Sequence, residues 1–365
     1  MHARRLIMAL SIIMLITACA VWALWATSQG TPLTLPKAET PPQSIPLAIL
    51  GDSDSHSYQD TVSFPEGGAD RGGRYRAQTW QWGELLSRLR GDQLDLGLWR
   101  TWGTRRVIAK AQDALGWQGR FPRKMDYRHN MAVSGAVCRD LSEGRMVKQL
   151  IDLMNENPQR WQKGIVVIRI GVNDVGTRQA LTAWAQNGRD PKLMGRVQEC
   201  IDQYKHAVTS IWQAHPQVRF VLVGLFDNSN WAPLIDNWQD PVDLQNIATG
   251  LNAFNAPLKS FAEQDKRLSF FDDQAWFRQH WGGRHSDGSP HFGLAHIDGR
   301  WPTHNTSGDS PNHANVQDGH AGTIWNLLWT QALVRHINTA FATGVSDIRD
   351  QDLAHYLSSN GISSW

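Results

Sequence analysis

The chain is nearly neutral, has no internal repeat and lacks the glycine signatures of nucleotide binding. Lysine and arginine number 36 against 34 aspartate and glutamate residues. The resulting net charge of +2 gives no reason to expect nucleic acid or an acidic surface as a partner. No Walker or dinucleotide-binding glycine pattern stands on a strand-to-helix turn. We therefore expect no cofactor and no nucleic-acid partner.

Cysteine is scarce, with three residues in the whole chain. Only Cys138 and Cys200 lie outside the apolar stretch at the N-terminus. Export of the protein would permit a disulfide between them. Two cysteines on facing helices could equally be free thiols in the core, and we favour that interpretation.

Histidine is not scarce, but regular metal-ligand spacing is absent. The His-Glu-x-x-His pattern of zinc enzymes does not occur in the histidine-rich part of the chain. We expect no metal site among the six histidines of this part, which are His285, His291, His296, His304, His313 and His320.

What the chain does have is the composition of a globular protein and many tryptophans. Its 365 residues suffice for one large domain or two ordinary ones, and 41% of them are hydrophobic against 19% charged. Most of the 18 tryptophans are expected in the core. Exposed loop tryptophans would instead offer flat surfaces for sugar rings, and the candidates are Trp231, Trp238 and Trp301.

Residues 1–30 form a targeting segment in our interpretation. Arg4 and Arg5 precede an uncharged run over residues 6–26, which is long enough to span a bilayer. Cys19 ends a sequence that resembles a lipobox, so an uncleaved anchor, a lipoprotein signal and a cleaved signal all stay open. Each of the three exports the rest of the chain, to the periplasm or beyond, and the first two attach it to the membrane.

The remaining sequence predicts an α/β domain over residues 47–345, after a Pro- and Thr-rich linker over 31–46 and before a tail over 346–365. Residues 279–315 have no period and are expected to form a substrate-shaping loop. Apolar runs predict strands over 47–50, 128–133, 165–170, 218–225 and 268–271, and helical periodicity predicts helices over 80–89, 105–115, 143–157, 197–214, 244–264 and 323–341.

Four short blocks carry the chemistry. They are Gly51-Asp52-Ser53, Ser134-Gly135, Gly171-Val172-Asn173-Asp174 and Asp318-Gly319-His320. A Ser, a Gly, an Asn and a His in this order resemble the four blocks of the SGNH/GDSL hydrolase superfamily, over roughly residues 44–345. The resemblance implies a three-layer, flavodoxin-like fold with a parallel central sheet.

The same resemblance assigns roles to these residues. Ser53 would be the nucleophile, while Ser55 and Ser57 do not directly follow Gly-Asp. The backbone N–H groups of Ser53 and Gly135 and the side-chain amide of Asn173 would form the oxyanion hole. Asp174 is expected to order its loop rather than to take part in the chemistry.

The base is less well defined by the pattern. The family expects an Asp three residues before its His, whereas Asp318 stands two residues before His320. His313 competes, with Asp309 four residues upstream. We favour His320 with Asp318 as its acid, and keep His313 as the alternative.

The predicted function is ester hydrolysis by an acyl-enzyme route. Export and the many tryptophans favour O-acyl esters, such as acetyl esters, of envelope or extracellular glycans; lipid esters are the other exported substrate class. Two alternatives remain, namely acyl transfer to a sugar hydroxyl at the same site and a non-catalytic glycan-binding module on the same scaffold.

Overall fold

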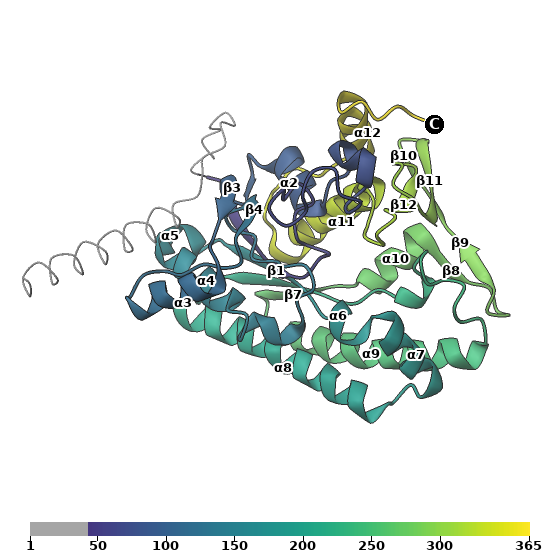
Figure 1. Cartoon of the computed structure of the whole chain (residues 1–365), viewed down its shortest axis with the longest axis horizontal. Helices are drawn as coiled ribbons and strands as arrows, with labels where there is room; N and C mark the ends of the chain where they lie inside the picture. The colour runs from purple at the N-terminus through teal and green to yellow at the C-terminus, as the bar shows by residue number, and fades with distance from the viewer. Residues whose placement is uncertain (1–42) are drawn as a thin grey trace, which may run out of the picture.

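A computed structural model describes residues 43–365 of the chain (Figure 1). The predicted targeting segment and most of the predicted linker lie outside these residues. Within residues 43–365, no helix is both long and apolar enough to cross a membrane. The first strand already begins at Ile45, so the last residues assigned to the linker belong to the domain.

A five-stranded sheet with all neighbours parallel forms the centre of the molecule. Its order is β2-β1-β5-β6-β7, which confirms the predicted α/β class with a parallel sheet. The strands are β1 (Ile45–Gly51), β2 (Leu94–Asp95), β5 (Ile165–Arg169), β6 (Arg219–Val223) and β7 (Leu268–Phe271).

Alternate residues of the central strands point into two separate cores. In β1, Ala48 and Leu50 belong to one hydrophobic cluster, while Leu47 and Ile49 belong to the other. The long strand-like apolar runs of the sequence are explained by this burial on both faces. The result is three layers, with α8 and α9 on one side of the sheet and α2 and α11 on the other (Figure 1).

The six predicted helices are present, and their ends lie close to the prediction except at the start of α8, which begins earlier. They are α2 (Trp82–Arg90), α3 (Arg106–Ala114), α4 (Met146–Asn155), α8 (Pro191–Ala214), α9 (Pro241–Ala262) and α11 (Thr323–Phe341). The structure adds helices that were not predicted, namely α5 (Pro158–Trp161), α6 (Val172–Val175), α7 (Arg178–Gln186), α10 (Asp273–Trp281) and α12 (Asp350–Ser359). Pro158 occupies the first turn of α5, where a proline is tolerated because its missing N–H would have no partner in the helix.

Residues 128–133 were predicted as a strand and do not form one. The segment runs beside β1 and makes backbone hydrogen bonds to it, with Met131 N donating to Ile49 O at 2.8 Å and Val133 N to Gly51 O at 3.0 Å. Only Asn130 forms a bridge with β1. An antiparallel hairpin precedes this segment, made of β3 (Trp99–Trp102) and β4 (Lys124–Tyr127).

Residues 279–315 are not a loop without structure. They form two small sheets from β8 (Gly282–Arg284), β9 (Pro290–Phe292), β10 (Leu294–Ile297), β11 (Arg300–Ser307) and β12 (His313–Asn315). These strands are three to eight residues long and rich in Gly and His, so they lack the apolar alternation that marks a strand in sequence. The predicted tail also packs on the domain, since Leu353 and Leu357 of α12 are buried in a core cluster.

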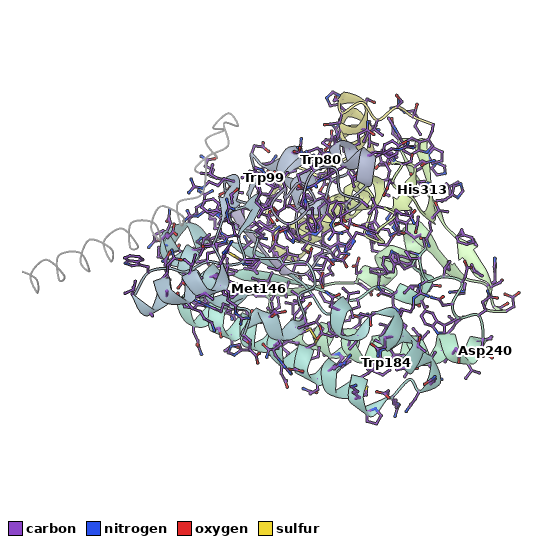
Figure 2. All side chains as sticks on the ribbon, in the orientation of Figure 1. Trp80, Trp99, Met146, Trp184, Asp240 and His313 are labelled. Carbon is purple, nitrogen blue, oxygen red and sulfur yellow. A yellow bond between two sulfur atoms is a disulfide. The ribbon has the colours of Figure 1, made fainter. Side chains whose placement is uncertain are left out.

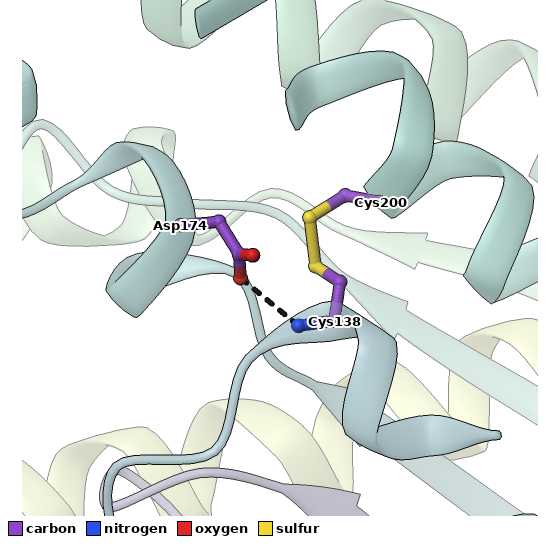
Figure 3. A group of neighbouring side chains, drawn as sticks. All are labelled: Cys138, Asp174 and Cys200. Atoms are coloured by element: carbon purple, nitrogen blue, oxygen red, sulfur yellow. Dashed lines mark hydrogen bonds between the residues drawn. A yellow bond between two sulfur atoms is a disulfide. The ribbon is translucent and has the colours of Figure 1, made fainter. Parts of the chain in front are cut away.

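Cys138 and Cys200 form a disulfide, so our preference for free thiols was wrong (Figure 3). The bond joins a 3₁₀ turn over Cys138–Leu141 to the middle of α8. The sequence leaves the choice between disulfide and free thiols open, because 62 positions separate the two residues and the packing of α8 against this turn brings them together.

Candidate active site

Ser53 lies on a tight turn at the carboxyl end of β1. The carbonyl of Asp52 accepts hydrogen bonds from the backbone N–H groups of Ser55 and His56, which reverses the chain within a few residues. Gly51 permits the turn, because a Cβ there would lie 2.7 Å from the carbonyl oxygen of Arg169 on the next strand. Ser53 is thereby held at the rim of the sheet and is half-buried.

A cavity of about 440 Å³ opens at this end of the sheet. It is lined by Ser53, Asn173, Asp318 and His320, which come from the turn after β1, from α6 after β5, and from the segment before α11. The structure therefore brings together four of the five predicted site residues, although more than 260 positions separate the first from the last. This is the edge at which open parallel sheets bind their ligands.

Asp318 and His320 form a hydrogen-bonded pair despite their unusual spacing. The Oδ1 atom of Asp318 lies 2.9 Å from Nδ1 of His320 and also accepts the backbone N–H of His320 at 3.1 Å. Gly319, with a φ of 89°, allows the chain to fold back over the two residues. Burial alone would raise the pKa of Asp318. The hydrogen bond to His320 and the nearby charge of Arg71 instead hold this pKa well below its usual range.

Arg71 contacts both residues of this pair, and the sequence analysis did not predict it as a site residue. Its backbone N–H and its Nη1 atom both donate to Oδ2 of Asp318, at 2.8 and 2.7 Å. The same Nη1 lies 2.6 Å from Nδ1 of His320. A general base at Nε2 needs the proton on Nδ1, so Arg71 and the Nδ1 proton compete for one position. The glycine-rich segment over residues 65–73 is thus attached to the site through one buried guanidinium.

His313 lies elsewhere. It belongs to β12, its Nδ1 is 2.8 Å from Oγ1 of Thr306, and it is not part of the cavity wall. Figure 2 places it among the small strands. Asp309 accepts the backbone N–H of Gln317 at 3.1 Å. The geometry therefore favours His320 over His313 as the partner of Ser53.

Two of the three predicted oxyanion donors, Gly135 and Asn173, lie on neighbouring segments. The Nδ2 atom of Asn173 donates to the carbonyl of Ala136 at 2.9 Å, which ties α6 to the turn that carries Gly135. Gly135 is exposed and has a φ of 80°, a conformation that favours glycine. Its N–H is not itself on the cavity wall, so Gly135 is the one predicted site residue that the cavity does not include.

Asp174 orders this region. Its Oδ2 atom accepts the backbone N–H of Cys138 at 3.0 Å, directly beside the disulfide (Figure 3). Burial raises the pKa of its carboxyl to about 6. The sulfurs and this carboxylate are the one group of metal-ligand atoms close together within residues 43–365. Because the two sulfurs are bonded to each other, the group does not fit a metal ion.

A second Ser–His–Asp cluster lies beside the first and was missed by the sequence prediction. Nε2 of His56 is 2.8 Å from Oδ2 of Asp60, and its Nδ1 accepts the backbone N–H of Ser134 at 3.1 Å, with the Ser134 hydroxyl also 3.1 Å away. Burial lowers the pKa of His56, against the opposing effect of its bond to Asp60. Arg71 joins the clusters, because its Nη2 donates to the Ser134 hydroxyl at 3.2 Å.

Aromatic and amide side chains form the rest of the cavity wall. Trp231 is half-buried and lines the cavity, whereas the other two candidate sugar platforms, Trp238 and Trp301, are buried in the core. Trp301 instead donates its indole N–H to the carbonyl of Ile362 at 3.2 Å. The remaining aromatic and amide residues of the wall are Phe226, Asn228, Asn315, Gln317 and Trp325.

Comparison with known proteins identifies a family. The sequence model of the GDSL-like lipase/acylhydrolase family matches residues 49–298. No curated protein matches the chain.

Solved structures that resemble the chain do so at low identity. They include the lipase Lip_vut3 from a goat rumen metagenome, at 14% identity and a TM-score of 0.39, covering 83% of this chain and 99% of that one. An extracellular lipase from Streptomyces rimosus has 16% identity and a TM-score of 0.35, covering 80% and 100%. A family 3 carbohydrate esterase from Clostridium thermocellum has 14% identity and a TM-score of 0.38, covering 83% and 100%.

Proposed function

Since this chain belongs to the GDSL-like lipase/acylhydrolase family and is an esterase of that kind, we propose that it hydrolyses esters through an acyl-enzyme intermediate on Ser53. The observation that carries the proposal is the shared cavity wall of Ser53, Asn173 and the hydrogen-bonded pair Asp318–His320. A serine needs an adjacent base, and a base needs an acid to hold its tautomer.

The proposed steps follow from this arrangement. With Nδ1–H donating to Asp318, Nε2 of His320 takes the proton of Ser53 Oγ as the oxygen attacks the ester carbon. The oxyanion is stabilised by the amide of Asn173 and the backbone N–H groups of Ser53 and Gly135. Collapse breaks the ester C–O bond, and the leaving alcohol receives the proton from His320. Water then repeats the sequence on the acyl-enzyme and releases the acid.

Within residues 43–365, no hydrogen bond joins the Ser53 hydroxyl to His320. Catalytic hydrogen bonds of esterases are often long without substrate and tighten when the substrate is bound. Closure of this contact is therefore expected to accompany binding rather than to precede it.

As substrate we propose O-acyl esters, such as acetyl esters, on glycans. Trp231 is half-buried and offers a ring face at the cavity, and the amides beside it suit sugar hydroxyls. Lipid esters are the competing class.

We also propose that the protein is exported and works in the periplasm or outside the cell, attached to the membrane through residues 1–30. The apolar run behind Arg4 and Arg5 supports this, and so does the disulfide, because such bonds persist in oxidising compartments. Fractionation of cells that express the full chain tests it: recovery in the cytosol with reduced cysteines would contradict the proposal.

The deciding experiment is hydrolysis of p-nitrophenyl acetate by the wild type and by Ser53→Ala, His320→Ala and His313→Ala. The proposal expects loss of turnover in the first two variants and near-normal turnover in the third. Loss in His313→Ala with an active His320→Ala would move the base to His313. Equal rates for wild type and Ser53→Ala would contradict the acyl-enzyme route.

The substrate class is tested with an O-acetylated oligosaccharide against p-nitrophenyl palmitate. A higher kcat/KM on the oligosaccharide is expected, and a higher value on the palmitate would assign the enzyme to lipids. Formation of a new sugar ester in place of free acetate would point to acyl transfer.

A further inference from the structure

A second cavity lies away from Ser53. It has a volume of about 250 Å³ and shares no lining residue with the first. Its wall comes from the β3–β4 hairpin, the segment between its strands and α4, on the side of the molecule where these elements are labelled (Figure 1). Trp99, which begins β3, is labelled on the same side in Figure 2.

Three arginines of this cavity surround one tryptophan. The guanidinium carbons of Arg100, Arg128 and Arg120 lie 4.2, 5.2 and 5.6 Å from the ring centre of Trp102. The ring is fixed, because its indole N–H donates to the carbonyls of Asp126 at 3.0 Å and Leu98 at 3.2 Å. The guanidinium groups are therefore held close together on an aromatic support before any ligand arrives.

Only one of the three positive charges has a carboxylate partner. Arg128 pairs with Glu156, with Nη2 2.6 Å from both carboxylate oxygens. The other acid of the wall, Asp152, pairs with Lys148 at 2.5 Å. Within residues 43–365, neither Arg100 nor Arg120 forms a salt bridge, and Arg120 donates to the carbonyls of Arg128 and Asn130 instead.

Arg100 is the arginine with the most unused hydrogen-bonding capacity. Its Nε atom is buried and has no partner within the part of the chain that the structure describes. Burial and the charge of Arg128 lower the pKa of Arg100, and burial lowers the pKa of Arg120 to about 10. The guanidinium groups of Arg100 and Arg120 repel each other, since neither is paired with a carboxylate within residues 43–365, and a bound anion would attract both.

We propose that this cavity is a second binding site for one phosphate or carboxylate group of a ligand. Its volume admits a part of the ligand about as large as one sugar ring. Arg100 supplies the planar donor fork that such groups accept in pairs, and Arg120, whose Nη atoms already donate to carbonyls, adds its positive charge. An acidic glycan and a lipid headgroup both carry this chemistry. The site is independent of ester hydrolysis, since it shares no residue with the Ser53 cavity.

The test is calorimetric titration of the full chain with inorganic phosphate, glucuronic acid and glycerol phosphate, with glucose as the neutral control. We expect the anions to bind, the affinity to fall as salt rises, and glucose not to bind. Arg100→Gln should weaken anion binding by about tenfold or more. Arg300→Gln is the matched control, because Arg300 also lies over a tryptophan, Trp301 at 4.6 Å, but already pairs with Asp298 at 3.0 Å.

Glu156→Gln gives a result that misfolding could not imitate. It removes the internal carboxylate that Arg128 now binds, so anions should bind more tightly than to the wild type. Preference for glucuronic acid would indicate an acidic glycan, and preference for glycerol phosphate would indicate a lipid headgroup. No binding by any anion, equal binding by Arg100→Gln and wild type, or weaker binding by Glu156→Gln would overturn the proposal.

Discussion

Two Ser–His–Asp clusters lie next to each other in this protein and differ in what surrounds them. In the cluster of Ser53, the side chains of His320 and Asp318 are 23% and 15% exposed and line a cavity. In the cluster of Ser134, those of His56 and Asp60 are 2% and 0% exposed. The residue types are the same, so composition alone does not decide which serine is the nucleophile.

The difference lies in the histidine nitrogens. Both nitrogens of His56 are engaged, Nδ1 by the backbone N–H and hydroxyl of Ser134 and Nε2 by Asp60. In His320 the contacts converge on Nδ1, and no protein group within residues 43–365 binds Nε2. A free, correctly oriented nitrogen is what a general base requires. The cluster of Ser134 therefore holds the turn of Gly135, while the cluster of Ser53 is arranged for proton transfer.

The largest expected effect separates the two serines directly. Ser53→Ala should lower kcat on p-nitrophenyl acetate by about 10³-fold or more, since no other group supplies the nucleophile. Ser134→Ala should lower it by less than about tenfold, because the backbone N–H of Ser134 still binds His56. Comparable losses in both variants would break the distinction between the clusters.

The sequence was sufficient for the parts of the fold that depend on continuous burial. Residues 165–168 are apolar because both faces of the sheet are covered, and β5 lies there. The order of the blocks also predicted that Ser53, Asn173 and His320 come together, and all three line one cavity.

The features that the sequence did not predict depend on contacts between residues far apart in the chain. Arg71 reaches Asp318 across 247 positions, from a segment that otherwise reads as a polar loop. The disulfide depends in the same way on tertiary packing. His56 and Asp60 did have a local signal, since a His and an Asp four residues apart directly follow the nucleophile turn.

The oxyanion hole offers the next test. Asn173→Ala should lower kcat by about 100- to 1,000-fold with little change in KM, because the amide acts mainly on the charge of the transition state. Asn173→Asp is the matched variant of similar size, and it should be at least as impaired, since a carboxylate repels the oxyanion. An active Asn173→Ala enzyme would remove this residue from the site.

Arg71 should act by holding the carboxylate of Asp318. Arg71→Gln removes the charged Nη1 donor to Oδ2 of Asp318, so kcat/KM should fall by about tenfold while the protein still folds. Arg71→Lys keeps a positive donor and should retain most of the activity. Equal losses of activity and of thermal stability in the two variants would assign Arg71 a purely structural role.

The smallest expected effect concerns stability rather than rate, in the turn that links the two clusters to the disulfide. The pKa of Asp174 is about 6 in the folded protein against an ordinary value of 3.8, so the folded state binds the proton more tightly than the unfolded state. Stability from this group is therefore present at pH 4 and is lost as pH rises through 6.

Asp174→Asn keeps an acceptor for the N–H of Cys138 without the charge. Between pH 4 and pH 7, the wild type should lose about 1 to 2 kcal/mol relative to this variant in the free energy of unfolding. Parallel stability curves would mean that the carboxyl of Asp174 is ionised in the folded protein without penalty.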